Sequence, residues 1–305
     1  MSTPTLLAEG LVQHFGRTPV LHGISLHVPK GSIYGFLGAN GAGKTTTIRT
    51  LLGLHHPRAG TIRLFGEDLA RHRIAILERT GTLIEHPSYY GHLSAVGNLK
   101  IVCRLRGLSP AGIEPTLHQV GLGDAMRKPV KRFSMGMKQR LGLAMALLPQ
   151  PELLILDEPM SGLDPVGIAE VRQLLLRLNR EQGVTIFYSS HILAEVERTA
   201  THVGVIDKGR MRFEGTLAEL MAQQAAETVV RVNDTTAALA TLEALQLTAH
   251  VREGRLHLPL LTDEATHALI QQLLGAGVQV YEVRGHQAVL EEQFLQLIQP
   301  TSASR

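Results

Sequence analysis

Residues 38–46 read GANGAGKTT and match the phosphate-binding pattern G-x-x-x-x-G-K-[ST]. An apolar run at residues 33–37 precedes them, and residues 45–54 follow with apolar side chains at helical spacing. Strand, glycine-rich loop and helix is the order that this pattern requires for phosphate binding. The stretch therefore predicts a phosphate-binding loop rather than an ordinary glycine-rich turn before a helix.

The residue types in this loop suit a nucleotide. Glycines let successive backbone N–H groups point inward, and the N-terminus of the following helix adds a positive dipole. Lys44 is expected to reach the β- and γ-phosphates, and the Thr45 hydroxyl is expected to bind Mg²⁺. The loop residues expected to contact ATP are Gly38, Ala39, Asn40, Gly41, Ala42, Gly43, Lys44, Thr45 and Thr46.

A second motif supplies acidic groups. Residues 153–158, LLILDE, form an aliphatic strand that ends in two carboxylates. Asp157 is the expected metal ligand, and Glu158 is expected to orient or activate the attacking water. A strand that ends in solvated acids is the alternative, but a phosphate-binding loop in the same chain favours the catalytic interpretation.

Length and composition limit the possible classes of protein. The 305 residues are enough for one sizeable domain and a smaller one. Cys103 is the only cysteine, which fits a reducing compartment, and a net charge of +3 without a basic block indicates no nucleic-acid partner. The sequence shows no secretory signal and no run of about 18 apolar residues, so a cytoplasmic location is expected.

The order of the predicted elements indicates an α/β fold. Residues 5–37 are typical of an antiparallel β-portion, and residues 71–150 are mostly helical, which predicts an inserted helical subdomain at about 86–150. Strands and helices then alternate, which predicts a parallel sheet. The helices expected in the helical stretch and after it cover residues 93–105, 113–120, 134–148 and 166–179, and the later strands cover 184–188, 203–207 and 210–214.

Beyond about residue 225 the sequence changes to short alternating strand and helix patterns, which predicts a second domain. We expect an ATPase domain at 1–220 and a small α+β accessory domain at 225–305. The accessory domain carries no catalytic motif, and the sequence leaves open whether it regulates, dimerises or binds a ligand. Its predicted strands are residues 229–232, 247–251, 255–258 and 278–283, and its predicted helices are 236–245, 263–274 and 289–298.

With these motifs in order, residues 5–215 resemble the ATP-binding subunit of ABC transporters. The tract 133–140, FSMGMKQR, lies where that family has L-S-G-G-Q-x-Q-R. The resemblance implies that Ser134 and Gly136, at a helix N-terminus, bind the γ-phosphate of an ATP held by a second subunit. Ser134 as a simple helix cap is compatible with that role. Three positions depart from the family pattern, namely Phe133, Met135 and Met137.

Four more site residues follow from the resemblance. Asp164 lies in a tract resembling the family's D-loop, and His191 resembles the switch histidine that contacts the γ-phosphate, although a lone histidine is more often an ordinary one. Phe15 falls where the family stacks a ring on adenine, with a core role as the alternative. Glu85 replaces the family's usual Gln and, as a carboxylate, could bind Mg²⁺ directly.

Glu85 and the S-x-G-M-K-Q-R variant resemble the branch associated with export of, or immunity to, bacitracin, lantibiotics and related compounds. The resemblance implies a P-loop NTPase of the ABC ATPase fold, with a mixed β-sheet core. It further implies a homodimer, or a pair with a similar second ATPase subunit, that encloses two ATP molecules and drives a separate transmembrane permease. The chain would then sit on the inner face of the cell membrane through that permease.

A soluble ABC-type ATPase acting on DNA or a protein complex is the alternative function. Such proteins insert a long coiled coil between the phosphate-binding loop and the tract around Ser134. The interval between residues 46 and 134 is too short for one and shows no sustained heptads.

Overall fold

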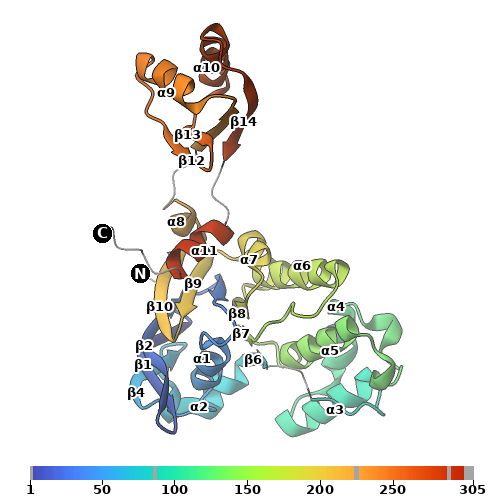
Figure 1. Cartoon of the computed structure of the whole chain (residues 1–305). Helices are drawn as coiled ribbons and strands as arrows, with labels where there is room; N and C mark the ends of the chain where they lie inside the picture. The colour runs from blue at the N-terminus through green and yellow to red at the C-terminus, as the bar shows by residue number, and fades with distance from the viewer. Residues whose placement is uncertain (1–2, 85–87, 223–226, 287–289, 299–305) are drawn as a thin grey trace. The chain divides into compact units, whose positions relative to one another are not determined.

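The structure is a computed structural model that describes residues 3–84, 88–222, 227–286 and 290–298. The chain divides into two compact units (Figure 1). One unit comprises Met1–Ala218 together with Leu297–Arg305, and the other comprises Glu219–Gln296.

An antiparallel sheet of four strands begins the larger unit, in the order β2-β1-β4-β5. Leu6 on β1 is paired with Val28 on one side and Leu64 on the other, and all three side chains are fully buried. This confirms the predicted antiparallel β-portion over β1 and β2, whereas residues 33–37 of the predicted stretch pair in parallel in the central sheet. The bounds are β1 (Leu6–Phe15), β2 (Thr18–Val28), β4 (Ala59–Leu64) and β5 (Glu67–Asp68).

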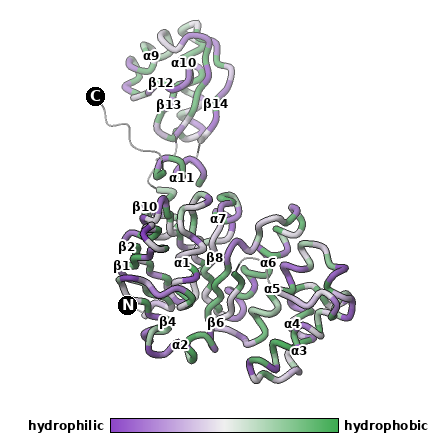
Figure 2. Tube along the Cα trace, turned by 60° about the horizontal axis from the view of Figure 1, so that its bottom comes forward, coloured by the Kyte–Doolittle hydropathy of each residue, from purple (hydrophilic) through white to green (hydrophobic). Residues whose placement is uncertain are grey.

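A sheet of six strands forms the centre of this unit, in the order β10-β9-β3-β8-β7-β6. Its neighbours are parallel except for the antiparallel β9–β10 hairpin. Every residue of β3, β7 and β8 is buried, as expected for parallel strands covered on both faces. Figure 2 shows hydrophobic stretches in the central region labelled β6 and β8. The bounds are β3 (Ile33–Leu37), β6 (Thr80–Leu83), β7 (Leu153–Leu156), β8 (Thr185–Ser190), β9 (His202–Asp207) and β10 (Arg210–Thr216).

Residues 71–150 are mostly helical, as predicted, but strand β6 within them was not predicted. Its sequence, TGTL, is short and contains Gly81, which weakens any strand signal. A Cβ on Gly81 would lie 2.3 Å from the carbonyl oxygen of Ala146, so close packing against helix α5 (Met135–Leu147) requires glycine there. Because packing requires glycine at position 81, the sequence of β6 lacks the pattern that is typical of a strand.

Helices flank the central strands. The predicted helices at 93–105, 113–120, 134–148 and 166–179 are confirmed, with ends shifted by a few residues. Ser94, Ser134 and Asp164 cap three of them by accepting a hydrogen bond from a backbone N–H three residues on. The α-helices are α1 (Lys44–Leu51), α2 (Leu69–Glu78), α3 (Ala95–Arg106), α4 (Ile113–Gln119), α5, α6 (Pro165–Gln182), α7 (Leu193–Thr199) and α8 (Leu217–Met221). Three short 3₁₀ helices cover Pro110–Gly112, Gly123–Ala125 and Val130–Arg132.

The smaller unit has the βαββαβ order of a ferredoxin-like fold. Its antiparallel sheet has the order β12-β13-β11-β14, and α9 and α10 pack on one face around buried Val230, Leu242, Leu256 and Leu269. The predicted strands and helices of this region are confirmed with small shifts. The bounds are β11 (Glu227–Val232), α9 (Thr235–Ala244), β12 (His250–Arg252), β13 (Arg255–Pro259), α10 (Asp263–Gly275) and β14 (Val280–His286), followed by α11 (Leu290–Ile298).

Candidate functional site

The phosphate-binding loop runs from the end of β3 to the start of α1. Gly38 is required by packing, because a Cβ there would lie 2.6 Å from the carbonyl oxygen of Ile206. Gly41 and Gly43 have φ angles of 79° and 113°, a backbone region that other residues rarely adopt. A loop with these backbone angles that leads into the N-terminus of α1 is the arrangement that binds phosphate.

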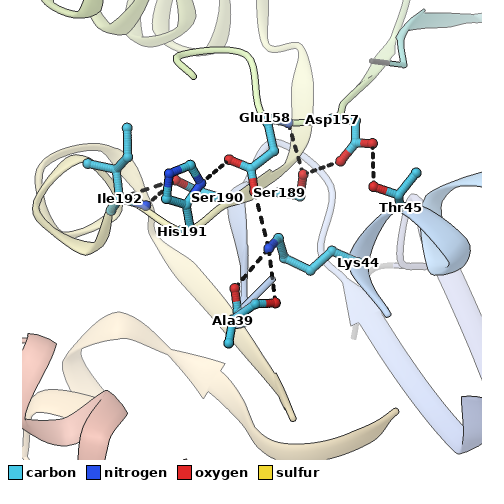
Figure 3. A network of polar contacts seen from close by, with 10 residues as sticks. Ala39, Lys44, Thr45, Asp157, Glu158, Ser189, Ser190, His191 and Ile192 are labelled. Atoms are coloured by element: carbon cyan, nitrogen blue, oxygen red, sulfur yellow. Dashed lines mark hydrogen bonds and ion pairs between the residues drawn. The ribbon is translucent and has the colours of Figure 1, made fainter. Parts of the chain in front are cut away.

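Lys44 is held at the centre of this loop (Figure 3). Its side chain is only 7% exposed, and Nζ donates to the carbonyl oxygens of Gly38 at 2.8 Å and Ala39 at 3.4 Å. Nζ also lies 3.2 Å from Oε1 of Glu158. The cation is thus pinned at the mouth of the loop between backbone oxygens and a carboxylate.

Asp157 lies at the end of β7 and is 3% exposed. Its Oδ2 accepts a hydrogen bond from the Thr45 hydroxyl at 2.8 Å, and its Oδ1 accepts one from the Ser189 hydroxyl at 2.6 Å. The predicted metal-binding pair, Thr45 and Asp157, is therefore brought together across residues far apart in the sequence. Figure 3 shows both oxygens of the carboxylate engaged.

Glu158 follows Asp157 with a φ of 50°, a strained backbone angle for a residue with a side chain. Its Oε2 lies 2.7 Å from Nδ1 of His191, and its backbone N–H donates to the Ser189 hydroxyl at 2.9 Å. Since Oε1 faces Lys44, the carboxylate is held between two nitrogen groups. The two predicted catalytic residues, Glu158 and His191, thus touch each other.

A cleft of about 470 Å³ opens over these groups. Its lining comes from the phosphate-binding loop, from the segments after β7 and β8, and from β2. The lining residues are Val20, Ala39, Asn40, Gly41, Gly43, Lys44, Thr45, Thr46, Glu158, Ser161 and His191.

Of the residues predicted from the resemblance, His191 lines the cleft, and the others lie elsewhere or outside the described residues. Ser134 and Gly136 lie at the start of α5, Asp164 caps α6, and Phe15 is 46% exposed with its ring edge-on to His55 at a centroid distance of 5.1 Å. None of these four lines the cleft. Glu85 lies outside the described residues.

Two polar residues of the site were not predicted from the sequence. Ser189, fully buried, contacts both acidic residues, and Gln139 donates from Nε2 to the carbonyl oxygen of Pro159 at 3.0 Å, which ties α5 to the segment after Glu158. The position of Ser189 two residues before His191, at a strand end, is the only sequence signal that could have indicated it.

Across the described residues, no helix combines the length and the apolar character needed to cross a bilayer.

Comparisons with known proteins identify the family of this chain. Residues 21–161 match the family described as ABC transporter. The chain is 45% identical to a bacitracin transport ATP-binding protein of Enterococcus faecalis, covering 77% of each chain. It is 43% identical to a lantibiotic transport ATP-binding protein of Streptococcus pyogenes, covering 68% of this chain and 90% of that protein.

A relative that is similar over nearly its whole length and a solved structure show the same family. The chain is 38% identical to an ABC transporter ATP-binding protein of Bacillus subtilis over 97% of both chains. Its structure matches that of an ATP-binding subunit of an ABC transporter with a TM-score of 0.65 and 31% identity, over 72% of this chain and 92% of the other. Members of the family bind and hydrolyse ATP. The chain therefore belongs to the family of ABC transporter ATP-binding subunits.

Proposed function

We propose that this chain powers the export of peptide antibiotics or drug-like compounds through a separate membrane permease. The observation that carries the hydrolytic role is that Lys44 and His191 both hold Glu158 beside Asp157. The substrate class is supported by relatives named for bacitracin and lantibiotic transport. Two copies, or this chain and a similar subunit, would enclose two ATP molecules on the cytoplasmic side of the membrane.

Thr45 and Asp157 are the residues that would hold Mg²⁺. A hydroxyl and a buried carboxylate 2.8 Å apart offer the hard oxygen donors that this ion prefers. Where residues are described, no group of three His, Cys, Asp or Glu gathers as a metal cage. That fits Mg²⁺, which keeps several waters and phosphate oxygens as ligands. When bound, the ion would neutralise charge on the transferred phosphate.

Glu158 is the proposed general base. Its carboxylate would accept the proton of the water that attacks the γ-phosphate, while His191 orients it through the contact at 2.7 Å. Lys44 currently pairs with Glu158, and an arriving phosphate would compete for that ammonium group. ATP binding would therefore free the carboxylate for catalysis at the same time as it places the phosphate.

The remaining predicted residues would act where two subunits meet. Ser134 and Gly136 would bind the γ-phosphate held by the other subunit, since both lie at the N-terminus of α5. Asp164, at the start of α6, would border that interface, and Phe15 would stack on adenine. Glu85 would bind Mg²⁺ or link it to the helical region.

A trapped complex tests this proposal. Tagged Glu158→Gln protein, supplied with ATP and Mg²⁺, should bind ATP without turnover and hold the closed dimer together with its permease. We would identify what co-purifies from detergent-solubilised host membranes. The matched control adds Lys44→Ala to the same protein, which should lose ATP affinity and the trapped partner. Undiminished hydrolysis by Glu158→Gln, or recovery of DNA or soluble partners alone, would refute the proposal.

The substrate class needs its own measurement. The purified ATPase and permease, reconstituted in lipid vesicles, should hydrolyse ATP faster when bacitracin or a lantibiotic is added. An unrelated peptide of similar size and charge serves as the control. Stimulation by neither antibiotic would leave the ATPase role intact and overturn the substrate class.

A further inference from the structure

The sheet of the smaller unit has two very different edges. One edge strand, β12, has only three residues, and short edge strands resist pairing with other chains. The other, β14, has seven residues and pairs only with β11 among the described strands. Its sequence, VYEVRGH, contains neither proline nor lysine, and its acidic and basic residues, Glu282 and Arg284, have charges of opposite sign. β14 therefore presents a row of backbone groups able to pair with another strand.

On β14, an acidic residue and a basic residue flank Val283. Glu282 and Arg284 lie on the same face of the sheet, because Arg231 is 3.6 Å from one Glu282 oxygen and Arg284 is 3.8 Å from the other. Val283 points to the opposite face and packs against the hydrophobic core. The one register irregularity with β11 falls before Glu282, so residues 282–286 pair regularly. Residues 282–284 are therefore acidic, apolar and basic in that order, with Val283 at the centre.

We infer that β14 pairs with β14 of a second copy of this chain, antiparallel and with Val283 at the two-fold axis. In that register Glu282 of each copy lies directly opposite Arg284 of the other, which gives two cross-strand ion pairs. A register centred on Glu282 would set two glutamates opposite each other, and one centred on Arg284 would set two arginines opposite each other. The two four-stranded sheets would join into one continuous sheet.

This interface differs from the proposed ATP-dependent dimer. The ATP-dependent contact involves the phosphate-binding loop and Ser134, whereas pairing through β14 uses backbone groups and needs no nucleotide. The two associations can therefore be measured separately in the full-length chain. Lys44→Ala should abolish the first and leave the second unchanged.

Charge reversal tests the pairing. We would measure self-association of nucleotide-free protein by sedimentation, comparing wild type with Glu282→Arg and with Arg284→Glu. Each single variant sets like charges opposite each other twice, so dimerisation should weaken about tenfold or more. Arg252→Glu, on the short edge strand β12, is the matched control and should associate like wild type.

Mixing the two variants gives the decisive readout. A Glu282→Arg chain and an Arg284→Glu chain restore both opposite-charge pairs, so the mixture should dimerise as heterodimers while each variant alone does not. Recovery in the mixture also shows that both variants fold. The inference fails if nucleotide-free wild type is monomeric at all concentrations, or if the mixture associates no better than its components.

The register can be tested by cross-linking. Cys103, 3% exposed, is first replaced by alanine so that no other thiol remains. Under oxidation, a mixture of Glu282→Cys and Arg284→Cys chains should form a disulfide dimer, because directly opposite residues are close enough for a disulfide. Equal cross-linking of Glu282→Cys alone would contradict the register centred on Val283.

Discussion

At the scale of single residues, Ser189 connects the two acidic groups of the site. Its hydroxyl donates to Oδ1 of Asp157 at 2.6 Å and accepts from the backbone N–H of Glu158 at 2.9 Å. Thr45 donates to the other oxygen of Asp157, so both oxygens are fixed in direction. Groups that orient metal ligands in this way usually affect metal affinity or activity by about 10- to 100-fold. Ser189 therefore acts as a positioning residue for the proposed Mg²⁺ site.

Replacing this residue gives the first prediction. Ser189→Ala should raise the Mg²⁺ concentration needed for half-maximal ATPase activity, and should lower activity about 10- to 100-fold at fixed Mg²⁺. ATP binding without Mg²⁺ should change little, because Ser189 does not line the cleft. Mg²⁺ titrations of the ATPase rate measure the effect.

The control for this variant is Thr80→Ala. Thr80 is also a fully buried strand hydroxyl, but it donates to the carbonyl oxygen of Ile76, away from Asp157. It should lose some stability and keep the wild-type Mg²⁺ dependence. An unchanged Mg²⁺ dependence in Ser189→Ala would show that the serine is merely structural.

A residue of the site could be predicted when the residues next to it in the sequence form a recognisable motif. Lys44 and Thr45 stand in a contiguous motif, and Asp157 and Glu158 end an aliphatic strand, so each could be assigned from neighbouring residues. Ser189 reaches Asp157 only because β7 pairs with β8 in parallel. The residues around position 189 do not show which strand lies beside β8, so the contact with Asp157 is found only in the folded sheet.

At the scale of elements, α6 and α7 are joined by a buried ion pair. Nη1 of Arg172 on α6 donates to both carboxylate oxygens of Glu195 on α7, at 2.9 and 2.7 Å. The side chains are 18% and 8% exposed. Because α6 begins at its cap Asp164 and α7 lies just after His191, this pair fixes two helices that border the site.

Removing one partner of this pair gives the second prediction. Arg172→Ala should lower the free energy of unfolding by about 3–5 kcal/mol, because it removes the close partner of the largely buried Glu195 carboxylate. Arg198→Ala is the matched control, since Arg198 is 64% exposed and lies 3.9 Å from the same carboxylate. Its loss should cost less than about 1 kcal/mol. Urea unfolding followed by circular dichroism compares the two, and equal losses would contradict this assignment.

Elements were predictable where periodicity is strong. Helix α6 and strand β7 have uninterrupted apolar patterns, and both were predicted close to their observed ends. Strand β6 was missed because Gly81 is needed for contact with α5, and the short helix α7 was also missed. Short elements fixed by tertiary packing leave little trace in the sequence.

At the scale of the whole molecule, the ATPase fold was predictable because the motifs of the chain occur in the same order as in the family that it resembles. The smaller unit was different. Its strands and helices were predictable one by one, but the sheet order β12-β13-β11-β14 depends on pairing between strands distant in sequence. The edge position of β14 follows from that order and could not be assigned beforehand.

The central sheet also makes the stability of the ATPase unit sensitive to alkaline pH. Tyr34 on β3 and Tyr188 on β8 are fully buried. Burial raises the pKa of both phenols, and that of Tyr34 is raised further by Glu214, which accepts its hydroxyl hydrogen bond at 2.9 Å. In the unfolded chain a tyrosine ionises near pH 10. The folded state therefore keeps protons that the unfolded state releases, and stability should fall as pH rises above about 10.

Tyr34→Phe isolates one of these phenols. Near pH 7 the variant should lose about 1 kcal/mol, the typical value of one hydrogen bond. Above about pH 10 its stability should fall less steeply than that of wild type, by about 1.4 kcal/mol per pH unit, because one proton fewer is released on unfolding. Urea unfolding by circular dichroism at several pH values measures both slopes, and Tyr90→Phe, which removes a phenol 54% exposed, should keep the wild-type slope. If Tyr34→Phe and wild type lose stability equally fast, the alkaline sensitivity has another origin, whereas a reduced slope locates it in the packed centre of the sheet that carries the site.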